Sequence, residues 1–301
     1  MWQYCRELNT DIQVEKFVDD ILVISPSEKR DAINRIAHAQ RNIFTYNSFQ
    51  TLDRQDCRDF GCRSDVKREN LRKKIIEELF AYVRLSDEEQ ISLNNGGARP
   101  LTEVKCEQKA YYVIGPPASG KSGICSKISD KFGCYILDSD YAKRKLPEYN
   151  NQIGGASLVH EESNKLIFHT DGLLDRCLDI NANIVIPKIG HDMKSIRTFC
   201  EGLKKANYHI YLISVDLDRQ KATQRAYKRF VETNRYVPLS LVFDGYGNDP
   251  TLNYFKLKQQ FSELFDGFCQ ISTDCPIRGD INIIESINMD DLKSIKWREV
   301  T

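Results

Sequence analysis

Residues 111–122 read Tyr-Tyr-Val-Ile-Gly-Pro-Pro-Ala-Ser-Gly-Lys-Ser. Four positions fit the pattern G-x-x-x-x-G-K-[ST]: Gly115, Gly120, Lys121 and Ser122. In this pattern an apolar strand delivers a glycine-rich loop, whose backbone N–H groups surround phosphate oxygens before a helix begins. Residues 110–114 predict that strand, and apolar residues at helical spacing after Lys121 predict the helix. Because strand, loop and helix are in register, a nucleotide site is favoured over a glycine-rich turn with a coincidental lysine.

The whole loop is expected to contact the nucleotide: Gly115, Pro116, Pro117, Ala118, Ser119, Gly120, Lys121, Ser122 and Gly123. Lys121 would reach the β- and γ-phosphates, and the Ser122 hydroxyl would ligate Mg²⁺. The expected cofactors are therefore ATP, or alternatively GTP, with Mg²⁺.

The composition is that of an ordinary globular protein. The 301 residues include 43 basic and 43 acidic side chains, so no net charge favours nucleic acid or an anionic membrane. No apolar run approaches the roughly 18 residues of a membrane span. The ten cysteines contain no C-x-x-C pair and no export signal precedes them, so we expect reduced thiols in the cytoplasm.

Residues 1–105 are predicted to form a helical N-terminal region of unknown role, with three amphipathic helices. Thr10 and Gln13 could cap the first of them. The third has a charged face, which we expect to be solvated rather than bound to nucleic acid: Lys67, Arg68, Arg72, Lys73, Lys74, Glu77 and Glu78. A break at residues 94–100 places the domain boundary before residue 106.

Residues 106–301 alternate β-rich runs with helical patterns, which predicts an α/β fold with a parallel sheet flanked by helices. The predicted strands are 110–114, 135–137, 184–186, 210–215 and 268–271. Sites in such sheets lie beyond the carboxyl ends of the strands, where Asp138 and Asp140 follow the second one. One carboxylate could accept a proton from an attacking hydroxyl while the other holds metal-bound water or the loop. Alternatively, Asp140 caps the next helix.

Five motifs occur in a fixed order over roughly residues 108–260. They are Gly115-Pro-Pro-Ala-Ser-Gly-Lys-Ser122, Leu137-Asp-Ser-Asp-Tyr-Ala-Lys-Arg-Lys-Leu-Pro-Glu-Tyr149, Gly154-Gly-Ala-Ser-Leu-Val-His-Glu-Glu-Ser163, Asn183-Ile-Val-Ile-Pro-Lys-Ile-Gly190 and Asn234-Arg-Tyr-Val-Pro238. This ordered set resembles the zeta-toxin family of P-loop kinases. The resemblance implies a P-loop fold, ATP-dependent phosphorylation of a hydroxyl, and a separate antitoxin protein as a possible partner.

The resemblance also implies roles for particular residues. Asp140 corresponds to the general base, and Lys143 to a basic substrate contact. Well-known members phosphorylate the 3′-hydroxyl of UDP-N-acetylglucosamine, and other branches resemble kinases of other nucleotide-linked substrates such as NAD. Pro187-Lys188 and Asp171 depart from the cell-wall-toxin pattern around the acceptor. Acceptor contacts are expected from five residues: Asp138, Lys143, Glu161, Glu162 and Asp171; for Glu162 a surface role is the alternative.

Arg225, Arg229 and Arg235 follow the fourth predicted strand, where P-loop kinases place a lid. Arginines there neutralise charge in the transition state, and a solvated helix face is the alternative. Two other function classes stay open: a polynucleotide or RNA-end kinase, and a nucleotide-binding regulatory protein. The N-terminal helices are expected either to cover part of the nucleotide or acceptor cleft or to form a self-contained bundle.

Overall fold

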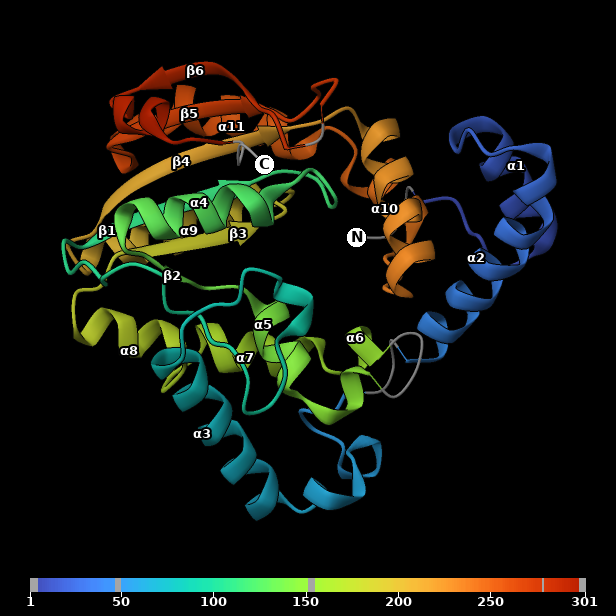
Figure 1. Ribbon diagram of the computed structural model, residues 1–301, viewed down its shortest axis with the longest axis horizontal. Helices are drawn as coiled ribbons and strands as arrows, with labels where there is room; N and C mark the ends of the chain where they lie inside the picture. Colours follow the sequence, from blue (N-terminus) through green and yellow to red (C-terminus); the bar gives the residue numbers. More distant parts are fainter. Residues whose placement is uncertain (1–4, 47–49, 151–154, 278, 298–301) are drawn as a thin grey trace. The chain divides into compact units, whose positions relative to one another are not determined.

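A computed structural model describes residues 5–46, 50–150, 155–277 and 279–297 (Figure 1). The chain divides into two compact units, each assembled from separate stretches of sequence. The helical unit comprises Met1–Gly97, Ser139–Leu173 and Thr223–Gly245. The sheet unit comprises Ala98–Asp138, Leu174–Ala222 and Tyr246–Thr301.

The sheet unit is organised on six strands in the order β2-β3-β1-β4-β5-β6. Their bounds are β1 Lys109–Ile114, β2 Tyr135–Ile136, β3 Ile184–Lys188, β4 His209–Asp216, β5 Gly267–Ser272 and β6 Asn282–Ile287. Neighbours run parallel except for β6, which is antiparallel to β5. The predicted parallel sheet and its five strands are confirmed. The sixth strand was not predicted, because it is a partly exposed edge strand with a weak apolar pattern.

Helices connect the parallel strands, as the α/β pattern predicts (Figure 1). Those of the sheet unit are α4 Lys121–Phe132, α8 Leu173–Asp179, α9 Met193–Lys205 and α11 Asp249–Gln260, with short turns η6 Ser262–Leu264 and η7 Asp290–Ser294. Helix α4 packs on β1 and β3, while α9 and α11 pack on β4. The helix predicted after the glycine-rich loop is therefore present and covers the strand that delivers the loop.

The helical unit has no extended sheet among its described residues. Its elements are α1 Asp11–Ile21, α2 Pro26–Tyr46, η1 Gln55–Cys57, η2 Phe60–Cys62, α3 Asp65–Ala81, η3 Glu88–Gln90, α5 Ser139–Lys145, η4 Pro147–Tyr149, α6 Gly155–Leu158, α7 His160–Phe168, α10 Arg219–Thr233 and the π-helix η5 Leu241–Tyr246, the last two shared with the sheet unit. The predicted capping box is confirmed, because Thr10 and Gln13 each accept a backbone N–H at the start of α1.

The two units divide the chain differently from the boundary predicted at residue 105. The N-terminal helices share a unit with residues 139–173 and 223–245, which the sequence assigned to the kinase domain. Residues 98–105 belong instead to the sheet unit. The physical reason lies in contacts that join α3 to α5 and α7, far along the chain.

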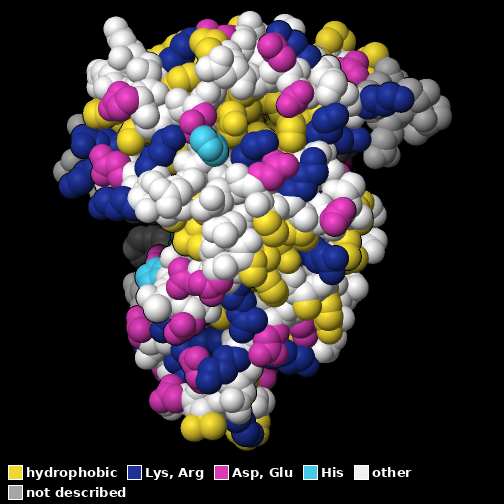
Figure 2. All heavy atoms as spheres, turned by 90° about the vertical axis from the view of Figure 1, so that its left-hand side faces the viewer, with side chains coloured by type: hydrophobic (Ala, Val, Ile, Leu, Met, Phe, Trp, Pro, Cys, Tyr) yellow, Lys and Arg dark blue, Asp and Glu magenta, His cyan; other side chains and the backbone are white. Residues whose placement is uncertain are grey.

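Charged side chains of both signs lie interspersed on the face drawn in Figure 2. The equal numbers of basic and acidic residues predict such mixing. The charged face of α3, however, is not wholly solvated as predicted. Arg68 is fully buried and Glu78 nearly so.

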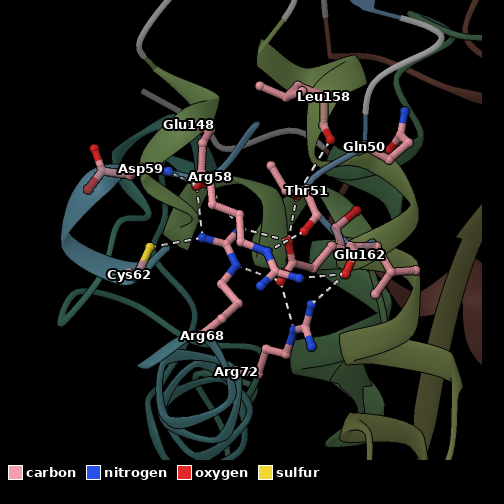
Figure 3. Close-up of polar contacts among 12 residues, drawn as sticks. Gln50, Thr51, Arg58, Asp59, Cys62, Arg68, Arg72, Glu148, Leu158 and Glu162 are labelled. Carbon is pink, nitrogen blue, oxygen red and sulfur yellow. Dashed lines mark hydrogen bonds and ion pairs between the residues drawn. The ribbon is translucent and has the colours of Figure 1, made fainter. Parts of the chain in front are cut away.

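The buried Arg68 guanidinium joins the carboxylates of Glu148 and Glu162, which lie 80 and 94 residues further along the chain (Figure 3). Its Nε and Nη2 donate to Glu162 at 2.7 and 2.6 Å, and its Nη1 donates to Glu148 at 2.8 Å. Arg72 Nε and Thr51 Oγ1 donate to Glu162 at 2.7 and 2.5 Å. We call these five residues the Arg68 network. It ties residues 51–72 to η4 and α7.

Burying charges costs several kcal/mol per ion, and only close pairing with additional hydrogen bonds offsets that cost. The Arg68 network satisfies this condition, since each Glu162 oxygen accepts two hydrogen bonds. Asp59 also donates its backbone N–H to Glu148 at 2.7 Å. Loss of Arg68 would leave the buried carboxylates of Glu148 and Glu162 without their main partner. The network therefore specifies which segments pack together.

Replacing Arg68 by alanine should lower the free energy of unfolding by about 3–5 kcal/mol, because Glu148 and Glu162 would stay buried without their main partner. Chemical denaturation of full-length protein measures this change. Lys73→Ala, on an exposed position of the same helix, is the matched control and should change stability by less than about 0.5 kcal/mol. Equal stability of the two variants would contradict a structural role for the network.

Truncation to residues 105–301 should give an insoluble or unfolded fragment, because it removes Thr51, Arg68 and Arg72 while keeping both buried acids. Solubility and circular dichroism measure the outcome. A folded fragment that is more active and more toxic on expression than the whole chain would instead indicate that the N-terminal helices only inhibit.

Candidate functional site

The glycine-rich loop lies between β1 and α4 in the sheet unit. Two of its residues, Ala118 and Gly120, have left-handed backbones, with φ of 60° and 88°. At Gly115 a Cβ atom would lie only 2.4 Å from the Val215 carbonyl oxygen, so the loop can pass β4 only with glycine there. Lys121 Nζ donates to the carbonyl oxygens of Gly115 and Pro116, both at 2.7 Å. The lysine thus folds back over the start of its own loop.

The loop has the features that a phosphate ligand requires. Helix α4 starts at Lys121, so the N–H groups of its first turn lie at the end of the loop, where a helix favours an anion. Ser122 is exposed, and nothing lies within 4 Å of a Cβ atom placed on Gly123. The Ser119 hydroxyl is buried without a hydrogen-bond partner among the described residues. The backbone carbonyl of Ser119 accepts a hydrogen bond from Thr273 Oγ1 at 2.8 Å. The glycine-rich loop therefore fits a bound polyphosphate.

The two acids after β2 are divided between the units. Asp138 ends a stretch of the sheet unit, where the preceding Leu137 N–H donates to Val185 at 2.9 Å. Asp140 lies in the first turn of α5, and therefore inside the helix rather than at its cap. One oxygen of Asp140 accepts from Lys143 Nζ at 2.9 Å, and the other pairs with Arg235. The structure thus brings Asp140, Lys143 and Arg235 together within the helical unit.

The three predicted lid arginines differ in their surroundings. Arg225 and Arg229 lie on α10, and Arg235 follows it. Arg225 is half-buried. Burial lowers the pKa of Arg229, against the opposing effect of Glu89 and Glu88, and its Nε has no hydrogen-bond partner among the described residues. Arg235 donates to both Asp140 and Glu89.

The remaining predicted acceptor residues are dispersed. Glu161 is exposed, and its backbone N–H donates to the Gln50 side chain at 3.3 Å. Asp171 is exposed in the turn after α7, with a left-handed φ of 63°. Glu162 is fully buried in the Arg68 network, so it is not a surface acid, and its oxygens are already engaged. Gly154, from the third motif, lies outside the described residues.

Two residues beside Asp140 were not identified from the sequence. Arg144 on α5 and Glu89 in η3 form a 3.0 Å ion pair, and Glu89 also pairs with Arg235 at 2.9 Å. These partners are 55 and 146 residues from Glu89. A charged residue in a short polar turn carries no local signal of such contacts.

No helix within the described ranges is long and apolar enough to cross a membrane. Among those same residues, no group of three or more His, Cys, Asp or Glu side chains is placed to hold a metal ion. The ten cysteines are all free thiols.

A model of the zeta toxin family matches residues 99–260, more than half of the chain. No curated protein matches. Among solved structures, similarity is found to the PezAT chromosomal toxin–antitoxin system of Streptococcus pneumoniae, with 12% identity, a TM-score of 0.51, and coverage of 81% of this chain and 91% of that one. The AvrRxo1-ORF1:AvrRxo1-ORF2 structure with sulphate ions gives 17% identity, a TM-score of 0.48, and coverage of 78% and 74%. The first likeness shows a shared fold, and the family match confirms the resemblance inferred from the five motifs.

The buried position of Glu162 predicts an acid-dependent loss of stability. Burial by itself would raise its pKa, but Arg68, Thr51 and Arg72 together lower it from 4.5 to about 2. A depressed carboxyl pKa stabilises the fold above the unfolded-state pKa, and this contribution disappears as pH falls through the folded-state pKa. Between about pH 5 and pH 2 the free energy of unfolding should therefore fall by about 3 kcal/mol on account of Glu162.

Denaturant unfolding at a series of pH values measures this dependence. The exposed neighbour provides the control, so Glu161→Gln should keep the wild-type slope whereas Glu162→Gln should flatten it. A Glu162→Gln protein with the wild-type slope would show that another group is responsible.

Proposed function

Because the chain belongs to the zeta toxin family and is an ATP-dependent kinase, we propose that it phosphorylates a hydroxyl of a nucleotide-linked small molecule. UDP-N-acetylglucosamine, a related nucleotide sugar or a dinucleotide such as NAD is the proposed acceptor. The observation that carries this proposal is the pairing of Asp140 with Lys143 and Arg235. A carboxylate held by two cations is ionised and oriented, as a base for a sugar hydroxyl must be.

The phosphate donor is assigned to the loop of the sheet unit. Lys121, Ser122 and the N–H groups at the start of α4 would hold the triphosphate of ATP with its Mg²⁺. Bound ATP supplies the phosphoryl group, and Mg²⁺ neutralises its negative charge. Lys121 would then exchange its contacts with the Gly115 and Pro116 carbonyls for phosphate oxygens.

The proposed base and most of the proposed acceptor contacts lie in the helical unit, whereas Asp138 lies in the sheet unit. Asp140 takes the proton from the attacking hydroxyl, and Lys143 contacts the acceptor. Arg225, Arg229 and Arg235 supply positive charge for the transition state. Asp138, Glu161 and Asp171 remain proposed acceptor contacts, and Glu162 is left out because it is buried in the Arg68 network. An antitoxin protein is the proposed partner, and the ten free thiols support a reducing, cytoplasmic location.

An ATP-dependent phosphorylation assay over UDP-sugars, NAD and oligonucleotides tests this function. Phosphate should appear on a UDP-sugar or dinucleotide. Asp140→Asn should lower turnover by roughly 10²–10⁴ while ATP still binds, because only the proton acceptor is lost.

Lys121→Ala is compared with Asp140→Asn. It should abolish phosphoryl transfer because the contact between the lysine and the phosphates is lost, and the chain should stay folded. Phosphorylation of oligonucleotides alone would replace the proposed acceptor class. An Asp140→Asn protein with full turnover and reduced stability would show that Asp140 is structural.

A further inference from the structure

Glu89 lies upstream of the stretch that matches the family, in the short turn η3 of the helical unit. One of its oxygens, Oε1, accepts from Arg144 Nη2 at 3.0 Å and from Arg235 Nη1 at 2.9 Å. These arginines come from different elements, α5 and the segment after α10. A single carboxylate oxygen therefore connects two guanidinium groups beside the proposed base.

Arg235 is shared between two acids. Its Nη1 donates to Glu89 and its Nη2 donates to Asp140. A guanidinium is a planar fork with fixed donor directions, so an acid on one nitrogen sets the orientation of the other. The position of Glu89 thus fixes the angle at which Arg235 meets Asp140.

The segment that follows the Glu89 turn is hydrogen-bonded to α5, the helix that also carries Asp140. Lys145, on α5, donates its Nζ to Glu78 Oε2 at 2.8 Å and to the carbonyls of Ser92 and Asn95 at 2.9 and 3.2 Å. Glu78 in turn accepts the Asn94 N–H at 2.9 Å. The distance between Glu89 and Asp140 is therefore set within one compact unit.

The surroundings of Glu89 carry a concentration of positive charge. Four cations face it or its neighbours: Lys143, Arg144, Arg229 and Arg235. Three acids lie in contact with these cations: Asp140, Glu88 and Glu89. Burial tends to raise the pKa of Glu89, but Arg144 and Arg235 hold it below its usual value, so Glu89 carries its negative charge. That charge offsets the cost of burying the arginines.

Both oxygens of Asp140 are engaged in this structure, one by Lys143 and the other by Arg235. To accept a proton from a hydroxyl, Asp140 must exchange one of these partners for the acceptor. The Arg235 side chain is only 13% exposed, so a guanidinium released without another acid beside it would be poorly hydrated. Glu89 supplies that acid.

We propose that Glu89 is a positioning residue for phosphoryl transfer, which holds Arg235 in place while Asp140 exchanges its pair with Arg235 for the acceptor hydroxyl. This inference rests on the function proposed above. Under this proposal Glu89, which lies before the matched residues 99–260, helps to position the acceptor-binding residues through its ion pairs with Arg235 and Arg144.

The test uses the full-length chain with ATP and UDP-N-acetylglucosamine as the probe. Glu89→Gln should lower kcat by about 10-fold or more, because a misplaced guanidinium disturbs the geometry of the base. The KM for ATP should change less than about threefold, since Glu89 acts on the acceptor side. Glu89→Asp, which keeps the charge, should recover part of kcat.

Glu77→Gln is the matched control, because it removes the same charge from an exposed position of α3 in the same unit. Its kcat should stay close to that of the wild type. A Glu89→Gln kcat equal to that of the wild type, or an equal loss in Glu77→Gln, would overturn the proposal.

A second readout is independent of the acceptor. Nuclear magnetic resonance of the Arg235 guanidinium should show slow rotation about its Cζ–Nε bond in the wild type and faster rotation in Glu89→Gln. Wild-type inactivity toward the probe would count against the acceptor proposed above, and the Arg235 signals would still decide the role of Glu89. Unchanged rotation in Glu89→Gln would overturn it.

Discussion

The buried pairing of Arg68 with Glu148 and Glu162 is the constraint on which the helical unit depends. A charge without contact with water is tolerated only where its partners are close and complete. Arg68 comes from α3, whereas both acids come from the segment after the proposed base. Any arrangement that separates these stretches would leave two carboxylates or one guanidinium buried and unpaired, which gives the packing its specificity.

A second buried ion pair also joins N-terminal residues to a distant part of the chain. Lys145 and Glu78 are both nearly inaccessible and 2.8 Å apart, and they join α5 to the end of α3. The helix that carries Asp140 is therefore held by N-terminal residues through Lys145, and η4 and α7 are held through Arg68. Residues 1–97 are structural components of the unit that carries Asp140.

Across its described residues, the sheet unit is stabilised by apolar packing and strand pairing rather than by buried ion pairs. Its strands β1 to β5 are mostly buried apolar runs that pair in parallel, and its glycine-rich loop is a local feature between β1 and α4 that β4 passes closely. Most of the loop is built from residues adjacent in sequence. Two distant residues also shape it: the Val215 carbonyl excludes any residue but glycine at position 115, and Thr273 donates to the Ser119 carbonyl. The glycine-rich loop is thus specified mainly by short-range chemistry, and the helical unit by long-range ion pairs.

This difference explains what the sequence by itself determined. The glycine-rich loop, the five parallel strands, the helix after the loop and the capping box of α1 all follow from residues within a few positions of one another, so periodicity and spacing predicted them. The pairing of Asp140 with Arg235, the burial of Arg68 and Glu162, and the contacts of Glu89 were decided only by the tertiary structure. On a helix, a charged side chain that faces solvent and one that faces a distant counter-ion have the same local pattern, because the partner that makes burial favourable lies tens of residues away along the chain.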